Sequence, residues 1–228
     1  MEGGGEGETS FELLLQEVYV VAACFNVTCC AYPFIGIYRL KGKNKSLYPY
    51  YDVLKFSYFC MSFWLAYGLG SGEIIPLVAN VLGCTMSGFC LVTYAWVFKE
   101  YQSVLRHLII GVAIFLTFQY LDLYYLIPLA SIVTGRLYVY CWVDISYLRV
   151  SRNPDKIDLL DCSLNSLNTI GWFVYGLLEK DLFIFAAFFF GFSMYVQIFS
   201  FYVYYKYLGK TVTESKVDII NPRKDLQA

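Results

Sequence analysis

The chain has 228 residues, of which 58% are hydrophobic, 20% aromatic and only 15% charged, and its mean hydropathy is +0.53. Soluble domains of this length rarely have such a composition, so it excludes an ordinary soluble globular protein. The net charge of −1 is not informative, because the two signs of charge are segregated along the chain, and no nucleic-acid partner is expected.

Apolar segments long enough to cross about 30 Å of hydrocarbon recur along the chain. They are too long and too continuously apolar for barrel strands, so they indicate helices. The sequence predicts an all-α integral membrane protein with seven transmembrane helices. Their expected ranges are 16–38, 53–70, 74–98, 104–121, 123–148, 158–178 and 182–205.

The chain contains an internal repeat with an offset of 108 residues: Trp64-Leu-Ala-Tyr-Gly-Leu recurs as Trp172-Phe-Val-Tyr-Gly-Leu, and Gly83 matches Gly191. The offset maps the first three spans onto the last three and leaves the fourth unmatched. Because three is odd, the unmatched helix gives both repeats the same orientation, so a 3+1+3 arrangement of parallel repeats is predicted. The expected parts are an acidic, Gly-rich outer N-terminus (1–15), a first triple-helix bundle (16–98), a linker helix (99–122), a second triple-helix bundle (123–206) and a tail (207–228).

Basic residues are segregated by the predicted topology. Fifteen of the seventeen Lys and Arg fall on one side of the membrane, which the positive-inside rule makes cytoplasmic. We therefore expect a multi-pass protein with its N-terminus outside and its C-terminus in the cytoplasm. The plasma membrane is the expected location, and an endomembrane stays open.

No chemical motif accompanies the apolar spans. The eight cysteines show neither metal-ligand nor disulfide spacing. Neither a nucleotide-binding loop nor a nucleophile arrangement occurs, and the short loops leave no room for a soluble catalytic domain. The sequence therefore predicts no metal, no cofactor and no enzymatic activity.

Three residues suggest a solute site. Asn80 lies in the middle of the third span, where its amide needs a partner, water or a solute. An interhelical hydrogen bond is the structural alternative. Trp64 and Trp172 occupy equivalent positions, where a flat ring could stack on the C–H face of a sugar. Their alternative role is that of interfacial aromatic residues.

Arg136 lies thirteen positions into the fifth span, where a charge is costly and a function is the default hypothesis. Three roles stay open: an ion pair with Asp144, a cytoplasmic gate with Asp158 or Asp161, or a carboxylate-binding group for an anionic solute. Pro33 predicts a kink in the first span, which would serve as a hinge or as a static bend.

These residues resemble the SWEET sugar transporter family, within the wider set of seven-helix PQ-loop-like proteins. The matches are the Trp172-Phe-Val-Tyr-Gly-Leu segment followed by Lys180-Asp181, the spacing from Tyr67-Gly-Leu to Asn80, and Lys43-Asn-Lys-Ser46. The resemblance covers about residues 18–207. It implies passive sugar transport by alternating access, with the solute held between the two repeats.

The resemblance implies six solute-binding positions and an outer closing contact between Tyr67 and Asp181. The sequence departs from the family pattern at Phe188, where the family has Asn, and at Cys141 and Asp158, where it has Pro. The six positions form three pairs: Asn80 with Phe188, Trp64 with Trp172, and Cys29 with Leu137.

The leading hypothesis is a facilitative carrier of a mono- or disaccharide in the lipid bilayer. A carrier of a small organic anion or amino acid that uses Arg136 is one alternative, and a seven-helix receptor is another. Assembly into a homo-oligomer stays open.

Overall fold

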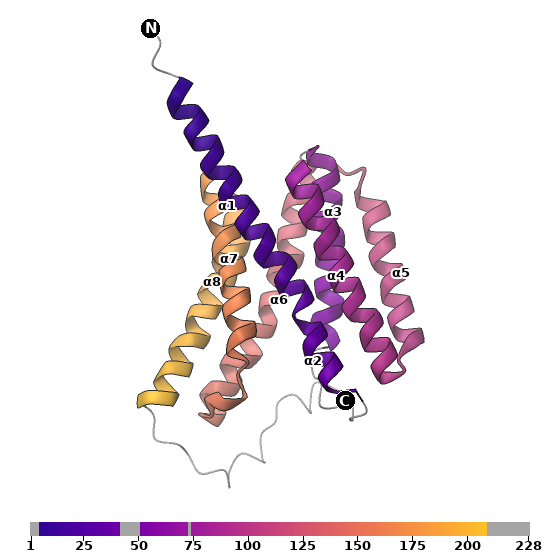
Figure 1. The fold of residues 1–228 in the computed structure, drawn as a ribbon, viewed down its shortest axis with the longest axis vertical. Helices are drawn as coiled ribbons and strands as arrows, with labels where there is room; N and C mark the ends of the chain where they lie inside the picture. The colour runs from indigo at the N-terminus through magenta and orange to yellow at the C-terminus, as the bar shows by residue number, and fades with distance from the viewer. Residues whose placement is uncertain (1–4, 42–50, 73, 209–228) are drawn as a thin grey trace.

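The computed structural model describes residues 5–41, 51–72 and 74–208, which contain helices and no strand. A 3₁₀ turn η2 (Pro154–Lys156) precedes α7, and a π turn η3 (Tyr204–Leu208) follows α8. The Lys43–Ser46 motif and residues 209–228 of the predicted tail lie outside the described residues. The helices are α1 (Gly5–Ala31), α2 (Pro33–Arg39), α3 (Tyr51–Ser71), α4 (Ile74–Phe98), α5 (Tyr101–Phe118), α6 (Leu123–Ser151), α7 (Leu159–Leu178) and α8 (Leu182–Val203) (Figure 1).

The predicted all-α fold is confirmed, because α1 with α2 forms the first expected span and each later span corresponds to one helix. The first helix begins earlier than predicted, at Gly5 instead of residue 16. Part of the expected N-terminal segment 1–15 is therefore helical. The segment Phe11-Glu-Leu-Leu-Leu15 explains this extension, since Leu and Glu are good helix formers.

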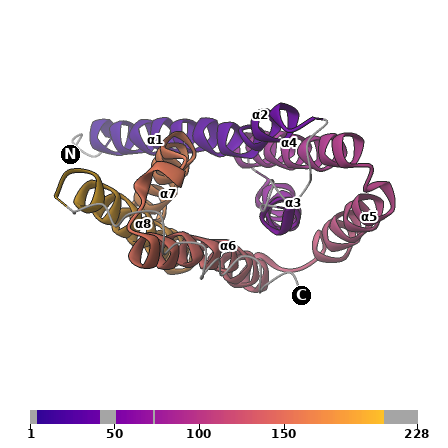
Figure 2. The same ribbon diagram turned by 90° about the horizontal axis from the view of Figure 1, so that it is seen from below.

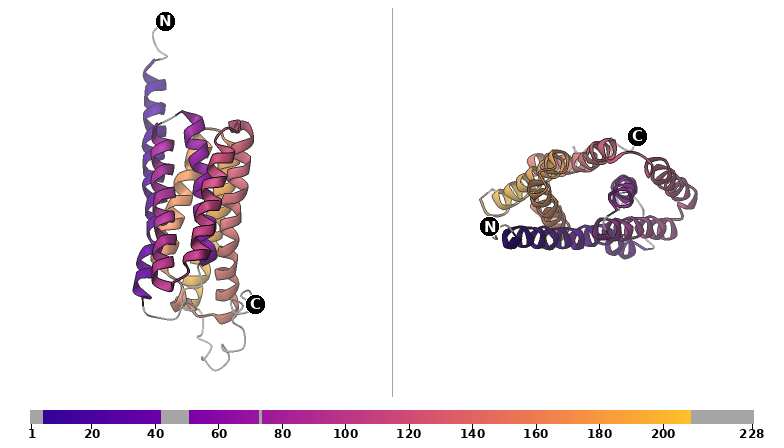
Figure 3. Two further views of the ribbon diagram at one scale, coloured as in Figure 1. Left: turned by 90° about the vertical axis from the view of Figure 1, so that its right-hand side faces the viewer. Right: turned by 90° about the horizontal axis from the view of Figure 1, so that it is seen from above.

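Six helices form a closed ring in the order α1, α4, α3, α6, α8, α7, and each packs on the next (Figure 2). In each repeat the third helix, α4 or α8, lies between the other two. The repeats meet at two seams, α1/α7 and α3/α6. The linker helix α5 packs outside the ring on α3 and α4, as the end-on view from the other side also shows (Figure 3). This is the predicted 3+1+3 arrangement.

Equivalent positions on α7 and α3 are packed differently. At α1/α7 a Cβ built on Gly171 would lie only 2.8 Å from the Cβ of Ala22, so the backbones approach closely. The repeat offset places Phe63 at the equivalent position of α3. Its ring packs against Phe118 of α5, with 4.9 Å between centroids. Backbone contact thus closes the α1/α7 seam at Gly171, whereas the equivalent position of the first repeat carries a ring that packs on the linker helix.

Five helical segments are long and apolar enough to cross a membrane. The helices α3 and α7 are less apolar, and they occupy equivalent places in the two repeats. Exposed tyrosines at the α5–α6 turn, Tyr120, Tyr124 and Tyr125, are of the type found at membrane interfaces. The five segments are Ser10–Arg39, Leu77–Phe98, Tyr101–Phe118, Leu123–Ser151 and Leu182–Tyr207.

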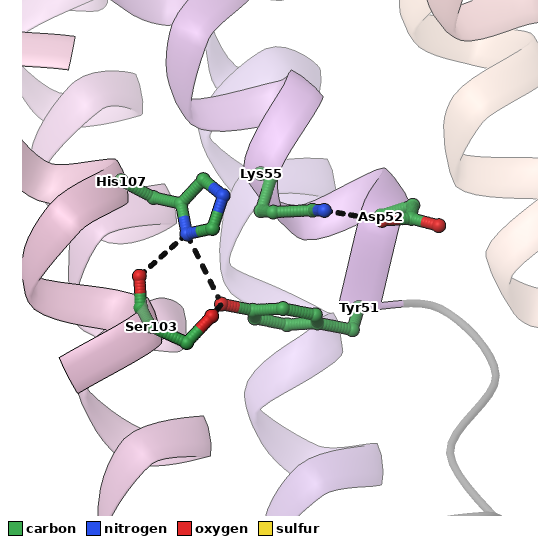
Figure 4. A network of polar contacts seen from close by, with 5 residues as sticks. All are labelled: Tyr51, Asp52, Lys55, Ser103 and His107. Carbon is green, nitrogen blue, oxygen red and sulfur yellow. Dashed lines mark hydrogen bonds and ion pairs between the residues drawn. The ribbon is translucent and has the colours of Figure 1, made fainter. Parts of the chain in front are cut away.

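A polar network fixes the linker helix to the first repeat (Figure 4). The Tyr51 hydroxyl of α3 lies 3.0 Å from Ser103 Oγ and 3.2 Å from His107 Nδ1, both on α5. His107 Nδ1 is also 2.6 Å from the Ser103 carbonyl oxygen. One turn along α3, Lys55 pairs with Asp52. The two contacts of Tyr51 join α3 to α5, so the linker helix belongs structurally with the first repeat.

Candidate solute site

A small cavity lies inside the ring, between the two repeats. Its walls come from α1, α3, α4, α7 and α8. The space open to the centre of a water molecule is about 10 Å³, which is enough for about one water. The side chains therefore fill most of the site in this conformation. The lining residues are Asn26, Met61, Trp64, Asn80, Trp172 and Phe188.

Three aromatic rings form one side of the cavity. Trp172 stacks on Phe188 with 5.8 Å between centroids and 24° between planes. Trp64 lies 6.3 Å from Trp172, also at 24°, and 6.3 Å from Phe188. The structure thus brings together three predicted positions from α3, α7 and α8. The three rings make this side of the cavity apolar.

Trp64 is held in place from the opposite repeat. Its Nε1 donates a 2.9 Å hydrogen bond to Thr134 Oγ1 on α6, and the Thr134 hydroxyl donates to the Ala130 carbonyl at 2.8 Å. Trp64 and Trp172 are only 4% and 5% exposed. Interfacial aromatic residues would lie at the protein surface, so burial excludes that alternative for both tryptophans.

Asn80 contributes an amide to the cavity. The residue is 2% exposed, and its side chain makes no hydrogen bond to any residue that the structure describes. The alternative of an interhelical hydrogen bond is therefore not found there. Asn80 lies about 9 Å along α4 from its first residue, Ile74, in the outer third of the helix instead of its middle. The site is nearer to the end with the α3–α4 turn.

Sequence reasoning missed two lining residues, Asn26 on α1 and Met61 on α3. Asn26 is 6% exposed, and its Nδ2 lies 3.6 Å from Met61 Sδ. The offset pairs these residues with Thr134 and Thr169, so the repeat gives no matching motif. The available signal was position, because Asn26 lies two helical turns before Pro33 and shares its face of the helix.

Two predicted solute-binding positions do not line the cavity. Cys29 and Leu137 are both partly buried, and Leu137 packs against the main hydrophobic cluster. The structure thus places four of the six positions around the cavity and leaves this pair in the surrounding packing.

Arg136 lies outside the cavity. The residue is exposed, and its guanidinium carbon is 5.2 Å from the centroid of the Phe56 ring and 5.3 Å from that of Tyr140. The buried positions of α6 include Thr134 and Tyr138. Arg136 falls midway between them and therefore points away from the helix's buried face. A carboxylate-binding role inside the cavity is thus not supported, and the contacts found are of the cation–π type.

Asp158 bridges the repeats at the end of the ring near η2. Its Oδ2 accepts a 2.8 Å hydrogen bond from the Tyr32 hydroxyl. Its Oδ1 accepts from the backbone N–H of Leu160 and of Asp161, both at 3.1 Å, and so caps α7. The expected gate paired Asp158 with Arg136, but the structure gives it Tyr32 as partner. Asp144 is partly buried on α6.

Pro33 interrupts the first span as predicted. It follows Tyr32, where α1 gives way to α2, and it has no N–H to donate to the Cys29 carbonyl. The Ile35 N–H instead donates to the Tyr32 carbonyl at 3.1 Å. The break therefore lies directly beside the Tyr32–Asp158 bond.

The opposite end of the ring holds the residues of the predicted closing contact. Asp181 caps α8 by accepting from the N–H groups of Phe183 and Ile184, at 2.9 and 3.0 Å. Tyr67 packs edge-on against Trp64 with 5.4 Å between centroids. Contact between Tyr67 and Asp181 stays a prediction.

No family model and no curated protein matches the sequence. Among solved structures, the fold is similar to that of a eukaryotic SWEET transporter, with a TM-score of 0.75. The two are 15% identical in sequence, and the match covers 86% of this chain and 98% of that chain. At this identity the likeness concerns the fold. Together with the apolar helices, it makes this chain an integral, multi-pass membrane protein of all-α fold.

Proposed function

We propose that this protein is a facilitative carrier that moves a sugar across a membrane by alternating access. The observation that carries the proposal is the amide of Asn80, which is buried between two repeats, faces a cavity and has no partner among the described residues. The cavity beside this amide has room for about one water, so a solute hydroxyl in the same place would give the amide a hydrogen-bonding partner.

The walls of the cavity have the two properties that a sugar requires. A pyranose has an apolar C–H face and a rim of hydroxyl groups. Trp172 and Phe188 offer flat rings for that face, whereas the Asn80 amide both donates to and accepts from hydroxyls. The fold supports transport because the similar structure is that of a SWEET transporter.

Alternating access would operate at the two seams. In this proposal the bundle 16–98 rocks against the bundle 123–206, with the linker 99–122 moving with the first. The N-terminus lies outside, so the Tyr32–Asp158 bond closes the cytoplasmic end, where Pro33 acts as a hinge. Tyr67 and Asp181 would close the outer end. The plasma membrane is the proposed location.

The alternative functions find less support. A carrier of organic anions or amino acids depended on Arg136, which lies outside the cavity and against two rings. A seven-helix receptor would bind its ligand without solute flux, so flux separates it from a carrier.

Uptake of a panel of labelled monosaccharides, disaccharides, amino acids and carboxylates into transporter-deficient cells tests the proposal. We expect saturable uptake of at least one sugar, and net uptake should stop when the gradient of that sugar has gone. Uptake of carboxylates or amino acids alone, or ligand binding without any uptake, would contradict it.

A further inference from the structure

A second amide faces the cavity with its hydrogen-bonding capacity almost unused. Asn26 is buried, and its Nδ2 contacts only the sulfur of Met61, at 3.6 Å. A thioether is a weak acceptor. The oxygen of Asn26 makes no hydrogen bond within the described part of the chain. Asn26 therefore offers a donor and an acceptor on the α1 wall.

The equivalent residue in the second repeat shows what a structural role looks like at this position. The repeat offset pairs Asn26 with Thr134. The Thr134 hydroxyl donates to the Ala130 carbonyl, accepts from Trp64 Nε1 and lies 3.2 Å from Cys60 Sγ, so its hydrogen-bonding capacity is used by the packing around it. Trp172 is the counterpart of Trp64, and no such bond joins it to Asn26 among the described residues. Asn26 thus lacks the packing function that its counterpart has.

The neighbouring helix leaves space for this amide. Gly83 lies three residues after Asn80 on α4 and therefore on the same face. A Cβ built on Gly83 would lie 2.8 Å from Met61 Sδ and 3.4 Å from Asn26 Nδ2. Even the smallest side chain at this position would crowd the wall. Glycine here allows Asn26 and Met61 to reach the cavity.

We propose that Asn26 is a second solute-binding residue, which pairs with Asn80 to form a polar edge supplied entirely by the first repeat. The inference rests on the proposed sugar transport. At the position equivalent to Asn80, the second repeat supplies Phe188, so its contribution to the wall is aromatic. The site then takes a cyclic polyol, such as a pyranose monosaccharide, with hydroxyls toward α1 and α4 and a C–H face toward α7 and α8.

Counterflow of labelled glucose and its monodeoxy analogues in proteoliposomes tests this assignment. The variants are Asn26→Leu, Asn80→Leu and the control Thr28→Val, which alters a residue on the exposed face of α1 that bonds only its own helix. We expect Asn26→Leu to raise the KM for glucose by about tenfold, the value of one hydrogen bond of about 1.4 kcal/mol. Thr28→Val keeps the original KM.

The deoxy analogues distinguish binding from a packing effect. The analogue that lacks the hydroxyl bound by Asn26 should have a higher KM than glucose with the unaltered protein. With Asn26→Leu the two KM values should be equal. Asn80→Leu should show the same pattern with an analogue that lacks a different hydroxyl. An unchanged KM for glucose in Asn26→Leu would overturn the role of Asn26. The same increase in KM for glucose and for every deoxy analogue would also overturn it, but either result would leave the proposed sugar transport standing. Absence of sugar flux in the unaltered protein would overturn the proposed function and this inference together.

Discussion

The hydroxyl of Tyr32 donates a 2.8 Å hydrogen bond to Asp158 and thereby joins the break in the first span to the first turn of α7. The two residues belong to different repeats, and the bond lies at the end of the ring away from the cavity. Asp158 performs two tasks with two oxygens, since Oδ1 caps α7 while Oδ2 accepts from Tyr32. Single substitutions can therefore separate closure from helix capping.

Tyr32→Phe removes the bond between the repeats and leaves the cap intact. The bond is worth about 0.5–1.5 kcal/mol, so the population open at this end should grow. We expect a faster rise of amide exchange at the α1–α2 break, around Tyr32, while the amides of Leu160 and Asp161 keep their protection. Hydrogen exchange followed by mass spectrometry in detergent checks this result.

Asp158→Ala removes both interactions. Loss of the N-cap costs about 1 kcal/mol, so exchange at Leu160 and Asp161 should rise as well. Equal protection of these amides in Tyr32→Phe and Asp158→Ala would show that Asp158 does not cap α7.

Asn80→Leu should have opposite effects on stability and transport. The substitution removes a buried amide without a partner among the described residues and replaces it with an apolar side chain of similar size. We expect the melting temperature of the empty protein in detergent to rise and the KM for sugar to increase about three- to tenfold. A lower melting temperature would indicate that Asn80 makes a structural bond.

Thr134→Val should destabilise the protein through Trp64. The variant leaves a buried indole N–H without its acceptor, which costs about 1–3 kcal/mol. The same change in a Trp64→Phe background should cost clearly less, because the donor is already absent. Melting temperatures of the four proteins complete this double-mutant cycle, and additive effects would rule out the bond.

Gly171→Ala should separate the α1/α7 seam. Its Cβ would lie 3.0 Å from the Ala22 Cα, a backbone atom that cannot yield easily. Overpacking of this kind costs about 1–3 kcal/mol, so the melting temperature should fall. Gly135→Ala is the matched control, since a Cβ there meets no atom within 4 Å. Equal effects of the two variants would contradict the close approach at Ala22.

The ring of helices could be predicted from the sequence because the repeat constrains it. Equivalent residues of two parallel repeats meet around one axis, so Trp64 and Trp172 had to lie near each other. Asn80 and Phe188, which also form an equivalent pair, reach the cavity as well, whereas the equivalent pair Cys29 and Leu137 does not. The repeat therefore predicted the arrangement of the helices, and the resemblance to the SWEET family selected the positions.

The remaining wall depends on residues for which the repeats differ. Asn26 and Met61 differ in residue type from Thr134 and Thr169, so the offset gave no matching motif that would mark them. The position of Asn26 relative to Pro33 indicated a helix face, but the packing, above all the space left by Gly83, places both residues at the cavity.

The position of Arg136 could have been found from helical phase. Buried residues of α6 recur every three or four positions, and Arg136 lies midway between two of them. Its position thirteen residues into the span suggested a site inside the helix bundle, but position along a span does not tell which face of the helix a residue occupies. The cation–π contacts with Phe56 and Tyr140 required the structure.

Counterflow in proteoliposomes decides whether Asn80 and Trp172 bind a transported sugar. Vesicles with the unaltered protein, with Asn80→Ala and with Trp172→Ala are loaded with unlabelled glucose, sucrose or a carboxylate, and uptake of the matching labelled solute is measured. We predict sugar counterflow in the unaltered protein, a marked loss in both variants and no carboxylate counterflow. Sugar counterflow that survives both substitutions would contradict this solute site, and counterflow of the carboxylate alone would contradict sugar transport.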